Sequence, residues 1–290
     1  EAERIVESLK TTAATHKQRS NLKELFHPSL KWVLSIGICI GVLQQITGIN
    51  AIYFYATSIF KQTGIGTDAA FASGILLSCT SVIFTIAAIC FIDKIGRRKL
   101  ILLGTTGITI SLLACAYGFN EASYLLTSKS IASFDFFEKE KLNAFSEQTF
   151  TSDVVFRNTM KTTLGNQVYQ KNEAKILEAA TRMNPRWVLG GILGFVACFS
   201  FSLGPVMWVL LSELFPNRYR GLAIGFIGFI NSFTSWFIQQ IFPWELSHLG
   251  NAMSFLLFGI AAFIGFVILY KILPETKGKS LEQLEIELII

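Results

Sequence analysis

The chain has 290 residues, of which 51% are hydrophobic and only 16% are charged. A soluble domain of this size cannot bury so many apolar side chains, so the composition favours an integral membrane protein. The formal net charge of +5 is modest, and it gives no reason to expect nucleic acid as a partner.

Six stretches of the sequence have no charged residue, and each is at least 21 residues long. A helix needs about 20 residues to cross the hydrocarbon core of a bilayer, where the backbone must satisfy its own hydrogen bonds. Buried helices of a large soluble protein would account for one or two such stretches, but not for six. The sequence therefore predicts an all-α membrane protein with six transmembrane helices, over residues 32–60, 69–92, 100–120, 187–212, 221–244 and 249–270.

Lysine and arginine are distributed unevenly around these spans. An even number of crossings puts both termini on one side, and the segments on that side carry 15 of the 25 Lys and Arg residues. The two short loops on the other side carry only Lys61, and long loops do not count in the positive-inside rule. We therefore expect a protein of the plasma membrane or a bacterial inner membrane, with both termini on the cytoplasmic side.

The segments between the spans divide the chain into parts. Residues 1–30 have the pattern of a cytoplasmic helical linker, and because they open inside an amphipathic pattern we expect a longer protein. Residues 31–120 and 187–273 hold three spans each, and residues 274–290 form a cytoplasmic tail. Residues 121–186 are an external insert, in which "KNEAKILEAATRM" predicts one amphipathic helix. An insert of this length is either a small ordered cap or a mobile loop.

The first span carries three amide side chains, Gln44, Gln45 and Asn50. Polar side chains at this depth are costly, and they face a bundle interior or a wet cavity. On an unbroken helix Gln45 and Asn50 would lie about 140° apart, so we expect local unwinding at Gly48 to bring them together. Amides donate and accept hydrogen bonds as sugar hydroxyls do, which favours a site for a neutral substrate. The alternative is that these amides only join helices.

Charged residues gather in two inner loops. They are Asp93, Arg97 and Arg98 after the second span and Glu213, Arg218 and Arg220 after the fourth. Arginine–carboxylate pairs between helix ends would stabilise one conformational state and so act in gating. From spacing alone, charges that only fix the orientation of the spans are an equal alternative.

The fourth and fifth spans carry further polar and bending positions. Gly204 and Pro205 remove a backbone donor and predict a bend in the fourth span. One turn later, Trp208 either stacks on a sugar ring or packs between helices. The fifth span has a second polar face, with side chains at four-residue intervals: Asn231, Ser235 and Gln239.

Nothing in the sequence has the spacing of a metal, cofactor or enzyme site. All five cysteines lie in the uncharged stretches without a C-x-x-C pair, and we expect them to pack between helices. P-loop, H-E-x-x-H and G-x-S-x-G motifs are absent. We therefore expect no metal, no cofactor and no enzyme activity.

Four motifs together resemble the carboxyl-terminal half of sugar porters in the major facilitator superfamily. They are "QQITGINAIYFY", "DKIGRR", "GPVMWVLLSELFPNRYRG" and "PETKG", in the family's order and spacing from Lys23 to Glu282 apart from the insert. The resemblance implies one six-helix half of a major facilitator bundle, which needs an amino-terminal six-helix half as its partner. It also implies a monosaccharide substrate and alternating access between the two halves.

The resemblance also implies roles for single residues. Its substrate-binding positions fall on Gln44, Gln45, Asn50, Tyr53, Ser81, Trp208 and Asn231. Tyr53 would lie at the outer gate, and Trp208 would line the inner side of the sugar. Candidate gating residues are Gly48, from the expected unwinding, and, from the resemblance, Gly204, Pro205, Asp93, Arg97, Arg98, Glu213 and Arg220.

Two positions differ from the family pattern. Ser81 stands where sugar-binding members usually have Asn, and Ser232 stands where many have Trp. Trp236, one turn later, is a candidate replacement. These differences leave the fold prediction unchanged and leave the identity of the sugar open.

The sequence therefore predicts the carboxyl-terminal half of a hexose or pentose transporter, with proton symport as one option. In proton-coupled family members the protonatable acid lies in the other half, so this chain does not decide the coupling. The alternatives are a non-transporting membrane sugar receptor and a half-size protein that forms a homodimer. Such receptors typically have a long soluble tail, and the short segment after Leu273 argues against one.

Overall fold

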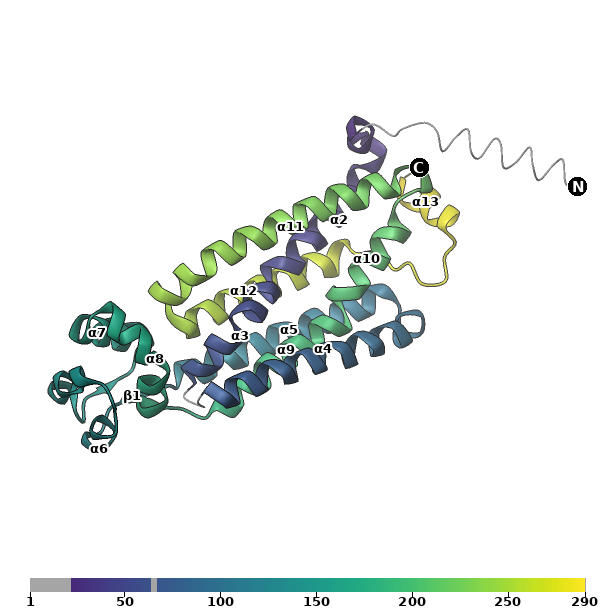
Figure 1. Ribbon diagram of the computed structural model, residues 1–290. Helices are drawn as coiled ribbons and strands as arrows, with labels where there is room; N and C mark the ends of the chain where they lie inside the picture. Colours follow the sequence, from purple (N-terminus) through teal and green to yellow (C-terminus); the bar gives the residue numbers. More distant parts are fainter. Residues whose placement is uncertain (1–21, 64–66, 290) are drawn as a thin grey trace, which may run out of the picture.

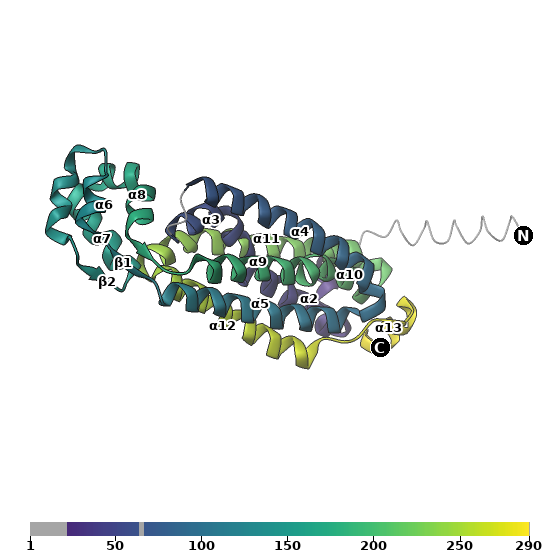
Figure 2. The same cartoon turned by 90° about the horizontal axis from the view of Figure 1, so that it is seen from below.

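The computed structural model describes residues 22–63 and 67–289 (Figure 1). Six helical segments within them are long and apolar enough to cross a membrane: Pro28–Gln62, Asp68–Ile95, Arg97–Asn120, Pro185–Leu214, Asn217–His248 and Gly250–Ile272. They form one elongated bundle (Figure 2). The predicted all-α membrane fold with six spans is confirmed. The part of the predicted linker before residue 22 lies outside the described residues.

The first span is two helices, α2 (Lys31–Ile46) and α3 (Ile49–Gln62). They are separated at Gly48, whose φ of 82° lies in the left-handed region that favours glycine. A β-carbon at Gly48 would stand 2.7 Å from the ring of Phe258. Both the backbone conformation and the lack of space therefore require glycine where the sequence predicted unwinding.

The fourth span is also two helices, α9 (Pro185–Phe201) and α10 (Leu203–Leu214). They are separated at Ser202, with φ −132° and ψ −95°, so the predicted bend at Gly204 and Pro205 is wrong by two residues. Pro205 lies in the first turn of α10, where backbone N–H groups have no acceptor within the helix. The N–H that proline lacks therefore costs no helical hydrogen bond. The proline therefore helps to start a new helix and does not bend a continuous one.

The remaining spans are single helices: α4 (Thr67–Ile95), α5 (Arg97–Asn120), α11 (Asn217–His248) and α12 (Gly250–Ile272). α5 packs against both α9 and α12, and α11 packs along α2. α4 and α11 are the least covered spans, because only 17% of the apolar window of each is buried. Apolar surface of this extent marks contact with lipid or with another protein.

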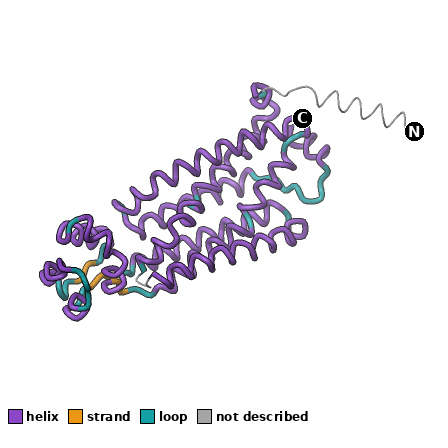
Figure 3. The backbone as a smooth tube through the Cα atoms, viewed as in Figure 1, coloured by secondary structure: helices purple, strands orange, loops and turns teal. Residues whose placement is uncertain are grey.

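Residues 121–186 form a small cap at the end of the bundle opposite α13 (Figure 1). Its strands β1 (Ser123–Leu125), β2 (Thr149–Phe150) and β3 (Thr181–Arg182) make an antiparallel sheet in the order β2-β1-β3. Figure 3 shows these strands gathered in the cap. Its helices are α6 (Ser128–Ala132), the 3-10 helix η3 (Phe137–Phe145), α7 (Asp153–Leu164) and α8 (Asn166–Ala180).

The cap has an apolar core of its own. Tyr124 stacks on Phe156 within it, with ring centroids 5.1 Å apart, and Tyr169 and Ile176 are fully buried beside them. Of the two alternatives for the insert, the structure gives the ordered cap. The single helix predicted over "KNEAKILEAATRM" ends at Ala180, because the next two residues pair with β1 as strand β3.

Short elements lie at the other end of the bundle. The 3-10 helices η1 (Leu22–Phe26) and η2 (Pro28–Leu30) precede α2. α13 (Leu281–Ile289) follows α12 after an irregular segment.

Gly48→Ala is expected to lower the melting temperature of the complete protein in detergent. The left-handed backbone costs a non-glycine residue about 1–2 kcal/mol, and the Phe258 ring must also move. Gly190→Ala is the matched control, since Gly190 is exposed on α9 and a β-carbon there has nothing within 4 Å. Equal melting temperatures for the two variants would contradict the prediction.

Candidate functional site

Amide side chains from three helices meet beside the break in the first span. Asn50 Nδ2 donates to Gln45 Oε1 at 2.9 Å, and Gln45 Nε2 donates to Asn231 Oδ1 of α11 at 3.1 Å. Asn231 Nδ2 donates in turn to Gln44 Oε1 at 2.7 Å. The left-handed residue between α2 and α3 thus brings together amides that a continuous helix would hold apart. We call Gln44, Gln45, Asn50 and Asn231 the amide cluster.

The amide cluster also connects the two helix breaks. Gln44 Nε2 donates to the backbone carbonyl of Leu203 at 2.9 Å, directly after the break at Ser202. Gln44 is only 4% exposed. Its side chain therefore links the end of α2 to the start of α10 and does not face a cavity.

A cavity of about 270 Å³ opens on the other side of the cluster. It is lined by Gln45, Asn50, Asn231, Ser232, Ser235, Trp236, Gln239 and Gln240. Ser235 Oγ receives hydrogen bonds from Asn50 Nδ2 at 2.8 Å and from Gln239 Nε2 at 2.9 Å. Every polar group in this lining is neutral, and amides and hydroxyls supply both donors and acceptors. The chemistry suits a neutral ligand with several hydroxyl groups.

Besides Gln44, three further predicted binding residues do not line this cavity. Ser81 on α4 shares a hydrogen bond of 2.9 Å with Ser200 on α9. The Trp208 ring lies against Gly228, and the residue is 41% exposed. The Tyr53 hydroxyl is buried without a hydrogen-bond partner among the described residues. Ser81 lies away from the cavity because α4 packs on α3 and α9, whereas the cavity lies between the first span and α11.

Sequence reasoning missed one lining residue completely. Gln240 follows Gln239 on α11 and is exposed beside the cavity. The signal was a second pair of adjacent glutamines inside an uncharged stretch, in "WFIQQIFP". Gln240 does not fall on the four-residue repeat of Asn231, Ser235 and Gln239, so that pattern did not predict it.

The end of the bundle opposite the cap carries an ion-pair network centred on Arg97. Its guanidinium lies 2.9 Å from Asp93 and 2.7 Å from Glu213, and so joins α4, α5 and α10. Glu213 Oε2 also accepts a hydrogen bond from Thr276 Oγ1 at 2.7 Å. Glu275 accepts from the backbone N–H of Arg97 at 3.1 Å, where a carboxylate stabilises the start of a helix. In the sequence, only the "PETKG" motif indicated Glu275 and Thr276.

Arg98 and Arg220 were expected in this network, and the structure places them elsewhere. Arg98 donates to the backbone carbonyl of Tyr270 at 2.7 Å, and Arg220 donates to that of Phe215 at 3.3 Å. Neither pairs with a carboxylate in the described part of the chain. Arg98 follows Arg97 by about 100° around the helix axis, so it faces the end of α12 and not α10. Arg218 pairs with Glu24 at 3.0 Å.

These features define a class of protein before any comparison. Six spans, two of them broken around a neutral polar cluster, are the arrangement of a multi-pass membrane protein of the secondary-transporter type. The chain belongs to the sugar (and other) transporter family, whose sequence profile matches residues 1–137 and 163–288.

Relatives and solved structures agree with this membership. The chain is 30% identical over 269 residues to the arabinose-proton symporter of Bacillus subtilis, covering 93% of this chain and 45% of the relative. It is 28% identical to the D-xylose-proton symporter of Escherichia coli over 87% of this chain and 40% of the relative. A solved proton:xylose symporter of the major facilitator superfamily superposes with a TM-score of 0.64 at 26% identity, over 97% of this chain and 49% of that one. The chain thus spans about half the length of the proteins it matches, and its fold is half of the major facilitator fold.

Arg97→Gln is expected to destabilise the complete protein by roughly 3 kcal/mol, because it leaves Glu213 largely buried without its partner. Arg218→Gln is the matched control, since it breaks an exposed pair with Glu24 that is worth under about 1 kcal/mol. Thermal or denaturant unfolding in detergent measures both losses. A loss for Arg97→Gln no larger than that for Arg218→Gln would show that the network contributes little.

Proposed function

We propose that this chain is the carboxyl-terminal half of a monosaccharide transporter that works by alternating access. The observation that carries the proposal is the neutral cavity, in which amides and hydroxyls from α2, α3 and α11 converge beside a helix break. A sugar presents hydroxyl groups that both donate and accept, and these side chains match both capacities. The names of the relatives, symporters of arabinose and xylose, support the same class of substrate.

An amino-terminal six-helix half is the partner that the exposed surface supports. α4 and α11 keep most of their apolar surface uncovered, and α11 also carries the open side of the cavity. A second half packed on α4 and α11 would cover both the apolar surface and the cavity. We place the Arg97 network and both termini on the cytoplasmic side and the cap outside, from the distribution of Lys and Arg.

Gln239→Ala separates sugar recognition from helix joining. Gln239 lines the cavity, yet the hydrogen bonds it donates go only to Ser235 on its own helix. The variant is therefore expected to weaken monosaccharide binding by about tenfold, the effect of one unpaired hydroxyl in a dry site, with an unchanged melting temperature. Isothermal titration and thermal unfolding of the complete protein measure the two quantities.

Two further variants serve as a comparison and a control for Gln239→Ala. Gln45→Ala should lower both affinity and stability, because Gln45 also bonds Asn231 across helices. Gln170→Ala removes an exposed glutamine of the cap helix α8 and should change neither. Unchanged affinity in both Gln239→Ala and Gln45→Ala would show that these amides only join helices and do not bind the sugar. Binding without uptake in the wild-type protein would identify a receptor instead.

Proton coupling is the second part of the proposal, and it is supported by the proton symporters among the relatives. Uptake of labelled pentoses and hexoses into proteoliposomes that contain the complete protein should rise when an inward proton gradient is imposed. An uncoupler should return it to the rate without a gradient. Uptake that does not change with the gradient would identify a facilitative transporter, and the rates for the individual pentoses and hexoses would still rank the sugars.

A further inference from the structure

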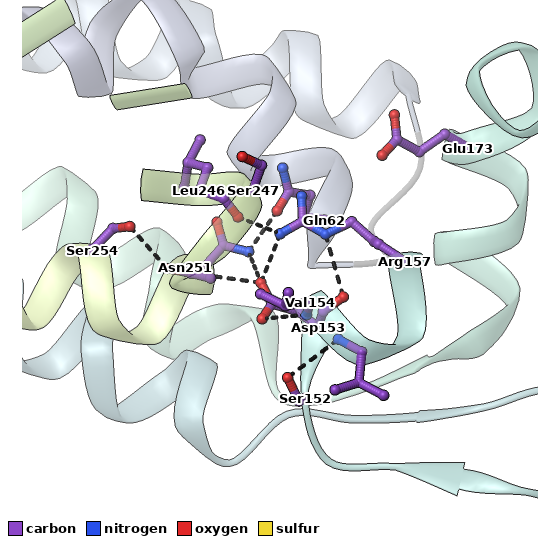
Figure 4. Close-up of polar contacts among 12 residues, drawn as sticks. Gln62, Ser152, Asp153, Val154, Arg157, Glu173, Leu246, Ser247, Asn251 and Ser254 are labelled. Carbon is purple, nitrogen blue, oxygen red and sulfur yellow. Dashed lines mark hydrogen bonds and ion pairs between the residues drawn. The ribbon is translucent and has the colours of Figure 1, made fainter. Parts of the chain in front are cut away.

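A buried polar cluster outside the proposed transport site joins the cap to the membrane helices (Figure 4). We call its members, Asp153 and Arg157 of α7, Asn251 of α12 and Gln62 of α3, the cap cluster. The side chains of Asp153 and Arg157 are 17% and 11% exposed, and Asn251 is fully buried. Both charged residues lie in the part of the cap that the family profile does not match.

The two charged residues bind the facing ends of two spanning helices. Asp153 Oδ2 accepts a hydrogen bond from the backbone N–H of Asn251, at the start of α12, at 3.0 Å. Arg157 Nη2 donates to the backbone carbonyl of Leu246, in the last turn of α11, at 3.0 Å. These are backbone groups that a helix end leaves without a partner, and each charge has the sign that the helix dipole favours. The two side chains also pair with each other at 2.9 Å.

The turn between α11 and α12 is shaped for this contact. Gly250 has a φ of 82°, and a β-carbon there would stand 2.3 Å from Asp153 Oδ1. A larger residue would both strain the backbone and displace the carboxylate. The cap is therefore seated directly on the turn.

Asn251 extends the contact to α3. Its Nδ2 donates to Asp153 Oδ2 at 2.9 Å and to Gln62 Oε1 at 2.5 Å. Gln62 is the last residue of α3 and is only 6% exposed. Helix α8 of the cap also packs against α3. The outer end of α3 is thus held by the cap directly and through Asn251.

We propose that Asp153 and Arg157 of the cap are positioning residues for the outer half of the broken first span. α3 starts at a single left-handed residue, Gly48, so contacts at its far end set its direction. The cap cluster fixes that end at Gln62 and so holds Asn50, in the first turn of α3, within the amide cluster. The inference rests on the proposed function, in which Asn50 contacts the sugar.

Hydrogen exchange of residues 49–62 in the complete protein, held in lipid nanodiscs, tests the proposal. Gln62→Leu removes only the last link and leaves the pair of Asp153 and Arg157 in place. Exchange in α3 should become about tenfold faster, the ratio for losing one buried hydrogen bond, while exchange in α7 stays unchanged. Arg157→Gln should speed exchange in both helices.

Transport kinetics supply the second measurement. Because Asn50 is a binding residue in this scheme, Gln62→Leu should raise the KM for monosaccharide uptake by about threefold with little change in the maximal rate. Asp135→Asn is the control, since it breaks an exposed ion pair of the cap with Lys175. It should change neither exchange in α3 nor the KM.

Exchange in α3 that stays at the wild-type level in Gln62→Leu, or that changes no more than in Asp135→Asn, would overturn the proposal. Faster exchange with an unchanged KM would overturn the positioning role. A wild-type protein that takes up no monosaccharide would overturn the proposed function instead, and exchange alone would then decide whether the cap cluster positions α3.

Discussion

A helix that is interrupted inside a bilayer leaves carbonyl and N–H groups that lipid cannot satisfy. Two spans of this protein are interrupted, and the amide of Gln44 at one break donates to the carbonyl of Leu203 at the other. The oxygen of that amide accepts a hydrogen bond from Asn231, which draws in α11. The middle of the bundle therefore depends on amides that are long enough to reach a neighbouring backbone and carry both a donor and an acceptor. Replacing them with apolar residues would remove the hydrogen bonds that join the two breaks and draw in α11.

The same geometry divides the amides by task. Gln44, at 4% exposure, is used up by backbone and by other amides, so it joins helices. Asn50 and Gln239 are half-buried and turn hydrogen-bonding groups toward the cavity. Under the proposed function, Gln44 therefore only joins helices and Gln239 serves recognition. Gln45 and Asn50, in contrast, both line the cavity and bond across helices. A sugar bound at the rim would meet groups already oriented by the joints behind them, which lowers the entropy cost of binding.

What the sequence predicted, and what it did not, follows from the range of each interaction. The six spans depend on local composition, and the break at Gly48 depends on the conformation of one residue, so both were accessible. The break at Ser202 was misplaced because contacts from another helix, including the one that Gln44 makes, help to define it. Arg98 was misassigned because neighbours in sequence point to different faces of a helix. In the cap cluster, Asn251 bonds Asp153, which lies 98 positions away in the sequence, and Gln62, which lies 189 positions away. No local sequence pattern indicates such pairs.

The charged contacts and the neutral amide cluster lie at different depths of the bundle. A charge is most costly at the bilayer centre and less so toward its edges, and the ion pairs accordingly lie at the two ends of the bundle. Each end uses the same device: a carboxylate at a helix start, Glu275 for α5 and Asp153 for α12, beside an arginine that reaches a second element. In a transporter such contacts would be either made or broken, which would give each end discrete states. Under the proposed function, the neutral amides between them would be the groups that adapt to a ligand, and the contacts at the ends would define the conformation.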